Sequence, residues 1–134
     1  MEICLDTDIL IDFLRGKRGI VETIERLEEE HELLTTSINV FELYYGAYRT
    51  GKDRNVKAVD ELTGRLKILK LTERSAKISG EMLAELESDG KAIDFRDVLI
   101  AGIVMERNVT LFTGNKRHFQ RVQGLKLFED GEVK

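Results

Sequence analysis

Acidic side chains follow the first apolar segment of the chain, at the point where a buried strand would end. Ile3, Cys4 and Leu5 form a short apolar run, Asp6 follows it directly, and Asp8 comes two residues later. An unpaired carboxylate near a protein core is costly, because burial removes its hydration. Two explanations are open: the acids cap the following helix, or they belong to a functional site.

Further acids occupy comparable positions later in the chain. Glu42 falls early in an expected helix, a few residues beyond the second apolar segment. Asp97 begins a run whose apolar residues recur at helical spacing, so its side chain is expected on the inward face. Asp94 lies three residues earlier, on the same side if the helix begins there. Each acid alone has an ordinary explanation as a cap, a surface residue or a first-turn acid, so the inference depends on their combination.

Hydrophobic patterning predicts the elements that would position these acids. Strands are expected at 2–5, 33–36, 68–71 and 109–113, with a further edge strand at 125–128. Helices are expected at 8–14, 20–30, 38–49, 56–66, 73–88, 98–105 and 115–122. Ser37 is expected to cap the helix that follows it.

Short apolar strands that alternate with helices are typical of a parallel sheet covered on both faces. The pattern therefore predicts an α/β fold in a single domain spanning residues 1–134, with a mostly parallel central sheet of four or five strands. In such folds, ligands bind beyond the carboxyl ends of the strands. Asp6 is expected at that edge, where Glu42 and Asp97 would join it.

A cluster of three or four carboxylates favours metal chemistry. Mutual repulsion would raise the pKa values of these acids unless a cation lay between them. Carboxylate oxygens select a hard ion, Mg²⁺ or Mn²⁺. The chain has only two histidines and one cysteine, which are too few to make a typical zinc site. Such ions can activate water and stabilise the leaving oxygen in phosphodiester hydrolysis.

Composition narrows the remaining classes of protein. Of 134 residues, 42% are hydrophobic and 34% are charged, which is typical of a globular domain. The net charge of −4 is unlike that of a strongly basic nucleic-acid-binding protein, although residues 115–126 carry four cations and no acid. No apolar run reaches the roughly 18 residues that span a bilayer, and no signal peptide precedes the first strand. With Cys4 as the only cysteine, we expect a cytoplasmic protein without a membrane partner.

Four segments resemble the motifs of PIN-domain proteins, and the similarity is closest to the VapC-type toxins of toxin–antitoxin pairs. The segments are DTDILIDFL (6–14), SINVFELYYGA (37–47), DFRDVLIAGIV (94–104) and TLFTGNKRHFQRVQGL (110–125). They follow the family's order and spacing over nearly the whole chain. The resemblance implies a three-layer α/β/α fold and a metal-dependent endoribonuclease that hydrolyses RNA phosphodiester bonds.

The resemblance also implies roles for individual residues. Asp6, Glu42 and Asp97 would be the catalytic acids that bind Mg²⁺ or Mn²⁺. Thr7 and Thr113 would be polar supports near the metal or the phosphate.

The last motif departs from the family's pattern. Relatives often carry a fourth acid there, and this chain has Asn115 and His118 at those places. Asn115 can still bind a metal through its amide oxygen, and Asp94 is a further candidate ligand that would supply the missing charge. The missing acid therefore affects the expected binding of a second metal ion more than the binding of the first.

Substrate and partners follow from the same reasoning. Cations expected to guide an RNA backbone are Arg15, Arg49, Lys52, Arg96, Lys116, Arg117 and Arg121. The aromatic residues at 41–48 and the apolar stripe at 56–66 suggest a homodimer interface. The resemblance implies a small antitoxin that packs on the helices at 17–30 and 38–49 and places an Arg or Lys in the acidic pocket.

Two other functions fit part of this pattern. The DTD string at 6–8 matches the opening of haloacid-dehalogenase-like phosphatases, with Asp6 as nucleophile and Asp8 as acid/base, but Glu42 then has no role. The second is a catalytically degenerate PIN fold that serves as a binding module, which Asn115 and His118 favour.

Overall fold

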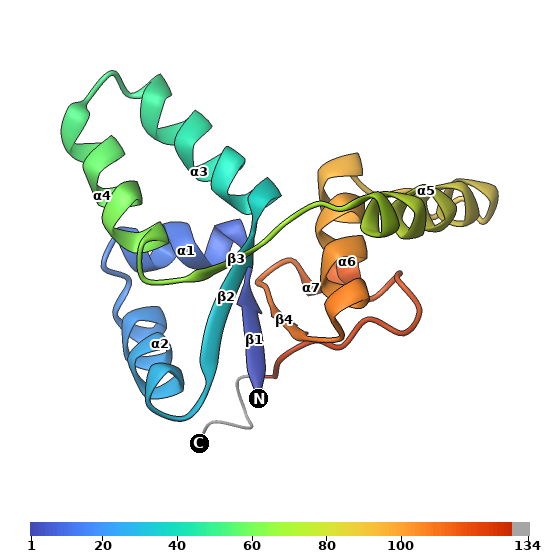
Figure 1. Ribbon diagram of the computed structural model, residues 1–134, viewed down its shortest axis with the longest axis horizontal. Coiled ribbons are helices and arrows are strands. Elements are labelled where there is room, and N and C mark those ends of the chain that lie inside the picture. The colour runs from blue at the N-terminus through green and yellow to red at the C-terminus, as the bar shows by residue number, and fades with distance from the viewer. Residues whose placement is uncertain (130–134) are drawn as a thin grey trace.

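The protein is built on a four-stranded parallel sheet. Its computed structural model describes residues 1–129. The strands are β1 (Glu2–Leu5), β2 (Glu32–Thr36), β3 (Lys67–Leu69) and β4 (Thr110–Phe112), in the order β3-β2-β1-β4 (Figure 1). The helices are α1 (Thr7–Leu14), α2 (Arg18–Glu30), α3 (Ser37–Arg49), α4 (Asp53–Thr63), α5 (Glu73–Ser88), α6 (Phe95–Arg107) and α7 (Lys116–Phe119). The predicted domain of residues 1–134 includes 130–134, which lie outside the described residues.

Two hydrophobic clusters cover the two faces of the sheet. Side chains alternate along β1, so Cys4 packs with residues of α5 and α6, while Ile3 and Leu5 pack with residues of α1, α2, α3 and α4. Figure 1 shows α5 and α6 on one side of the strands and α1, α2 and α4 on the other. The predicted α/β/α arrangement is confirmed. No helix within residues 1–129 is long and apolar enough to cross a membrane.

The start of α3 differs from the prediction. Thr36, not Ser37, is its N-cap: the Thr36 backbone is extended, and its side-chain oxygen accepts the backbone N–H of Asn39 at 3.2 Å. The Asn39 side chain accepts the backbone N–H of Thr36 in return, which completes a capping box. Ser37 fails as a cap because it is already helical and its hydroxyl accepts the backbone N–H of Leu71 instead.

The predicted edge strand at 125–128 is also wrong in part. Within residues 1–129, this segment contributes a single parallel bridge between Leu111 and Leu127. The backbone N–H of Leu111 donates to the Lys126 carbonyl, and Phe128 donates to the Leu111 carbonyl. The chain therefore runs beside β4 without forming a fifth strand.

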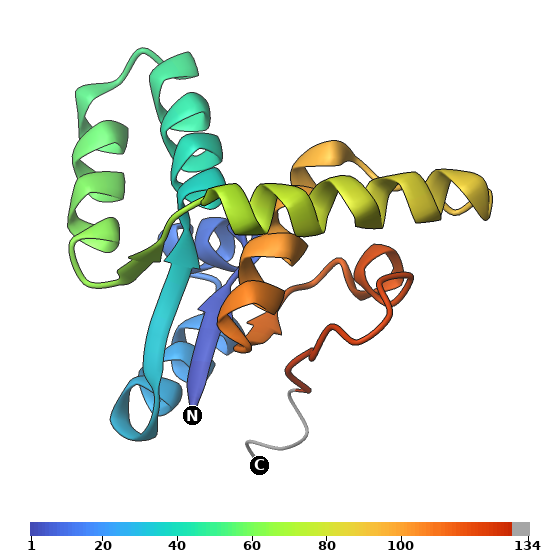
Figure 2. The same cartoon turned by 45° about the vertical axis from the view of Figure 1, so that its right-hand side comes forward.

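Close packing of α5 on α6 fixes the helix that carries Asp97. Gly102 of α6 lies against α5 so tightly that a Cβ atom there would come within 1.9 Å of Ser79 Oγ and 2.8 Å of the Ser75 carbonyl oxygen. The Ser79 hydroxyl donates to the Val98 carbonyl at 3.0 Å. Figure 2 shows α5 lying across α6, with its C-terminal end reaching beyond the sheet.

Candidate active site

Asp6 is held at the carboxyl end of β1, in the centre of the sheet. It is the N-cap of α1, and its Oδ1 accepts the Thr7 backbone N–H at 2.9 Å and the Asn39 side-chain amide at 3.0 Å. Its Oδ2 accepts the Thr113 hydroxyl at 2.7 Å. Only 6% of the residue is exposed. Burial is the larger effect and raises the pKa of Asp6, although these three hydrogen bonds oppose the rise.

Thr7 connects Asp6 to Glu42. Its hydroxyl donates to Glu42 Oε1 at 2.7 Å and accepts the Asn39 side-chain amide at 2.8 Å. Asn39 is fully buried, so it orients Asp6 and Thr7 from inside the protein. Thr7 and Thr113 are therefore both next to the acids, as their expected supporting roles require.

Asn39 is a site residue that was not predicted from the sequence. Its position three residues before Glu42 on the same helix face was the available signal. What the pattern could not show is that Asp6, 33 residues away in the chain, accepts the second hydrogen bond.

Asp6, Glu42 and Asp97 line one pocket of about 480 Å³ that is open to solvent. Its complete lining is Asp6, Thr7, Asp8, Ile11, Glu42, Asp97, Gly114 and Asn115. Burial, followed by the negative charges of Asp6, Asp94 and Glu42, raises the pKa of Asp97 to about 6. The three predicted acids thus come together and repel one another.

Asp8 is a fourth carboxylate of this pocket. Its Oδ2 accepts the backbone N–H of Gly114 at 2.9 Å, and a Cβ at Gly114 would come within 2.7 Å of that oxygen. Burial, and to a smaller extent the negative charge of Asp6, raise the pKa of Asp8 to about 6. Asp8 was expected only as a cap or as the acid/base of a phosphatase, although it lies just two residues after Asp6 in the sequence.

Asn115 and His118, the two residues at which the last motif differs from the family's pattern, lie at the edge of the pocket. Asn115 lines it, and its Nδ2 lies 2.9 Å from His118 Nδ1. His118 Nδ1 is 3.8 Å from Asp97 Oδ2. Asn115 is therefore close enough to the acids to serve as predicted, and His118 contacts one of them.

Asp94 lies outside the lining of the pocket. Its carboxylate caps α6 by accepting the backbone N–H of Arg96 at 2.8 Å, and it also accepts from the Arg96 side chain. These hydrogen bonds, together with the positive charge of Arg96, lower the pKa of Asp94.

The expected RNA-binding cations have different surroundings. Arg96 Nη1 is 3.7 Å from Glu42 Oε2, and Arg15 lines a neighbouring groove that shares Glu42 with the pocket. Arg49 stacks over the ring of Tyr45, Lys116 bonds to Glu129, Arg121 donates to the carbonyls of Lys91 and Ala92, and Lys52 and Arg117 are exposed. Arg96 thus lies within ion-pair distance of an acid of the pocket, and Arg15 lies in a groove that Glu42 also lines.

The donor set of the pocket fits a hard divalent cation. Four carboxylates line it, and all their metal-binding atoms are oxygen. Within residues 1–129, no three His, Cys, Asp or Glu side chains are already arranged around a common point for an ion. The oxygen atoms of the four carboxylates match the ligands that Mg²⁺ and Mn²⁺ prefer, so these residues are the ones that would hold such an ion.

Fold and site together define a class: an α/β/α protein whose acidic pocket lies at the carboxyl edge of a parallel sheet. The sequence pattern of the PIN domain matches residues 3–125, so the chain belongs to the PIN-domain family. This match rules out the haloacid-dehalogenase-like alternative, because the whole set of motifs falls in one other family.

Named relatives refine this assignment. Ribonuclease VapC2 of Haemophilus influenzae is 33% identical over 128 residues, which cover 94% of this chain and 96% of that protein. The tRNA(fMet)-specific endonuclease VapC of Shigella flexneri is 29% identical over 127 residues, with 94% and 96% coverage. The structure of VapBC2 from Rickettsia felis bound to a promoter DNA fragment aligns with a TM-score of 0.88 and 29% identity, covering 96% of this chain and 98% of that chain.

Proposed function

We propose that this protein is a divalent-metal-dependent endoribonuclease and the toxin of a toxin–antitoxin pair. The observation that carries the proposal is the gathering of Asp6, Asp8, Glu42 and Asp97 in one open pocket. Their repulsion is relieved by a divalent cation, and the relatives with the same fold are named ribonucleases.

In this proposal Asp6, Glu42 and Asp97 hold Mg²⁺ or Mn²⁺, and the amide oxygen of Asn115 adds a neutral ligand. When bound there, such an ion would lower the pKa of a water molecule and stabilise negative charge on the leaving oxygen. Thr113 and Asn39 fix the orientation of Asp6, and Thr7 fixes one oxygen of Glu42. Thr7 bonds to Oε1 of Glu42, so the other carboxylate oxygen, Oε2, is not hydrogen-bonded to Thr7.

The substrate is a single RNA strand that reaches the pocket along a cationic path. Arg15 and Arg96 lie beside Glu42, and Arg49, Lys116 and Arg117 extend the path. Because the protein is acidic overall, its affinity for RNA depends on these local cations and falls with rising salt.

The partner is a small antitoxin that covers the site in the cytoplasm. The groove beside the pocket, about 310 Å³, is lined by α1, α3 and α4 and meets the pocket at Ile11 and Glu42. An amphipathic segment seated there can extend an Arg or Lys to the acids. Support comes from the VapBC complexes that this fold resembles.

The test is cleavage of RNA by the purified chain with Mn²⁺ or Mg²⁺, comparing Asp97→Asn with Asp53→Asn. Both residues are acids in the first turn of a helix, but Asp53 is exposed on α4. Asp97→Asn is expected to lower the cleavage rate at least about 100-fold and to weaken Mn²⁺ binding, because it removes a charged ligand. Asp53→Asn is expected to behave as the wild type.

The outcomes separate the remaining functions. Equal cleavage by the wild type and Asp97→Asn would contradict the assigned site. Tight binding of Mn²⁺ without cleavage of any RNA, by protein free of antitoxin, would favour the degenerate binding module instead.

A further inference from the structure

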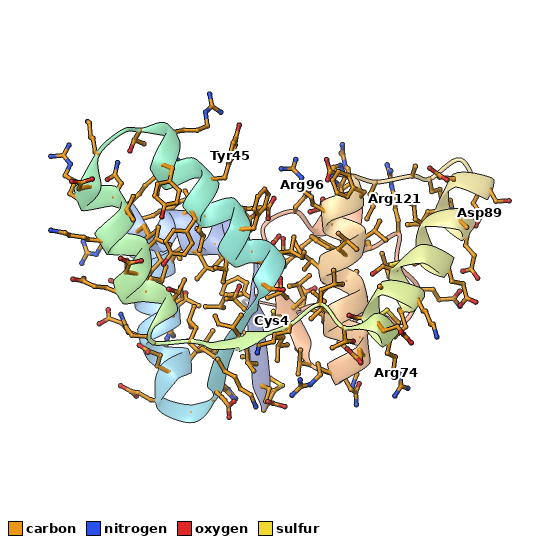
Figure 3. The ribbon with its side chains drawn as sticks, turned by 45° about the horizontal axis from the view of Figure 1, so that its top comes forward. Cys4, Tyr45, Arg74, Asp89, Arg96 and Arg121 are labelled. Carbon is orange, nitrogen blue, oxygen red and sulfur yellow. The ribbon has the colours of Figure 1, made fainter. Side chains whose placement is uncertain are left out.

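The guanidinium of Arg96 joins two carboxylates from different elements beside the acidic pocket. Asp94, the N-cap of α6, accepts from Arg96 Nε at 3.2 Å and from Nη2 at 3.4 Å. On the other side, Nη1 faces Glu42 Oε2 of α3 at 3.7 Å. Figure 3 shows Arg96 between α3 and α6.

These two contacts are unequal. Asp94 holds both the backbone N–H and the side chain of Arg96, so it fixes one edge of the guanidinium. The distance to Glu42 exceeds a hydrogen bond, so the Nη1 edge retains donor capacity toward the pocket. The Arg96 side chain is 43% exposed, whereas that of Glu42 is 20% exposed. A ligand arriving from solvent can therefore reach the guanidinium.

We propose that Arg96, anchored by Asp94, is a charged arm that balances Glu42 in the free protein and binds a substrate phosphate in the complex. The identity of that phosphate as part of RNA rests on the proposed function. Asp94 is then a positioning residue for the arm and not a metal ligand. A guanidinium suits this role because its planar edge matches phosphate oxygens.

The arm makes binding of the cation and of the nucleic acid interdependent. In the free protein, the positive charge of Arg96 next to Glu42 opposes a divalent ion in the pocket. A phosphate on the Nη1 edge neutralises part of that charge, so the ion binds more tightly. By linkage, the ion strengthens binding of the phosphate by the same factor.

The first experiment measures Mn²⁺ affinity by titration calorimetry in the absence of nucleic acid. Arg96→Gln is expected to tighten Mn²⁺ binding roughly 3- to 10-fold, because a repelling charge is lost. Arg96→Lys keeps the charge and is expected to stay near the wild type. Arg74→Gln is the matched control, since Arg74 lies on α5 away from the α3–α6 contact (Figure 3), and no change is expected there. Unchanged or weaker binding by Arg96→Gln would overturn the proposal.

A second variant separates an anchor from a metal ligand. Asp94→Asn can still cap α6, because an amide oxygen accepts the same backbone N–H. It is expected to change Mn²⁺ affinity by less than about 3-fold, whereas loss of a ligand would weaken it about 10-fold or more. A loss of that size would make Asp94 a metal ligand and contradict the proposal.

The third experiment measures phosphate binding by fluorescence anisotropy with a short single-stranded DNA in Mn²⁺ buffer. The slope of log affinity against log salt concentration is negative, and in Arg96→Gln it is expected to become less negative by about 0.7, since one phosphate contact is lost. Asp94→Asn is expected to weaken binding, and Arg74→Gln to leave affinity and slope unchanged.

These measurements distinguish the arm from the proposed activity. If the wild type cleaves no RNA while Arg96→Gln still tightens Mn²⁺ binding and makes the slope less negative, the activity fails and the arm stands. If RNA is cleaved while both Mn²⁺ affinity and slope are unchanged in Arg96→Gln, the arm is wrong and the activity stands.

Discussion

At the scale of single residues, one carboxylate serves both the fold and the site. Asp6 ends β1, caps α1 and receives hydrogen bonds from Asn39 and Thr113. The cap holds its side chain at the sheet edge, and the other two bonds fix its rotamer. The two explanations considered for this acid, a cap and a site residue, are therefore compatible. An asparagine at this position could keep the cap, but it would lose the charge and the acceptor oxygen that the Thr113 hydroxyl bonds to.

The crowding of acids predicts how the stability of the metal-free protein changes with pH. Burial and the charge of Asp6 raise the pKa of Asp8 and of Asp97 to about 6, whereas an unfolded chain has an aspartate pKa of about 3.9. Between these values the folded state binds more protons than the unfolded state, so stability falls as pH rises through 6. With a chelator present, the melting temperature is expected to be higher at pH 5 than at pH 7.

Variants provide the control for this pH dependence. Asp97→Asn removes one of the carboxyl groups whose pKa is raised and is expected to be more stable than the wild type at pH 7, with a flatter profile. Glu61→Gln, at an exposed position on α4, is expected to leave the profile unchanged. A wild-type melting temperature that falls from pH 7 to pH 5 would contradict the assigned shifts.

Residue patterns revealed the acids of the site better than their supports. The approach of three acids could be predicted because Asp6 directly follows an apolar strand, Glu42 lies early in the helix after the second strand, and Asp97 lies in the first turn of an apolar helix. Asp8 and Asn39 were missed because each has a sufficient local explanation as a capping residue. Their distinguishing partners, Gly114 for Asp8 and Asp6 for Asn39, are distant in the chain.

At the scale of elements, the order of helices and strands was predictable, while element ends were not. Periodicity located α3, but competition between Thr36 and Ser37 for the cap depends on backbone angles and on Leu71 from another segment. Residues 125–128 have a strand-like composition, yet they meet β4 at a single bridge. In both cases tertiary contacts determine where the element begins or whether it forms, and these contacts cannot be predicted from the hydrophobic pattern.

The contact between α5 and α6 predicts opposite effects for two glycines. Gly102→Ala places a Cβ against Ser79 and the Ser75 carbonyl, and the backbone oxygen cannot move aside. This substitution is expected to lower the free energy of unfolding by about 1–3 kcal/mol. Gly80→Ala, on an exposed part of α5 with open space around it, is expected to raise that free energy by up to about 1 kcal/mol through helix propensity. Urea unfolding measures both, and equal effects would contradict the close approach.

At the scale of the whole molecule, α3 presents an aromatic face to solvent. Phe41 is 59%, Tyr45 53% and Tyr48 65% exposed. Other apolar residues of these two segments pack within the monomer: Leu43, which lies among the aromatic residues at 41–48, and Val59 of the 56–66 stripe belong to the same hydrophobic core. A homodimer through α3 therefore stays a prediction that depends on the three exposed rings.

Sedimentation velocity at micromolar concentrations tests this assembly. The wild type is expected to sediment as a dimer, and Tyr48→Glu is expected to shift it toward monomer, because a buried charge opposes association. Leu71→Ser, at a position 40% exposed in the connection between β3 and α5, is the control and is expected to remain dimeric. A wild type that is monomeric throughout would contradict the interface.

The pairing of β1 with β4 has a consequence for how the chain is made. Asp6 leaves the ribosome early, but Thr113, which bonds to it, lies 107 residues later, and Gly114, which bonds to Asp8, comes later still. The central strand therefore gains its β4 neighbour only after the 107 residues that separate Asp6 from Thr113 have been synthesised, and until then Asp6 and Asp8 lack these two hydrogen bonds. If the proposed cleavage of RNA needs both carboxylates in their folded positions, a nascent chain that has not yet reached β4 is expected to be inactive.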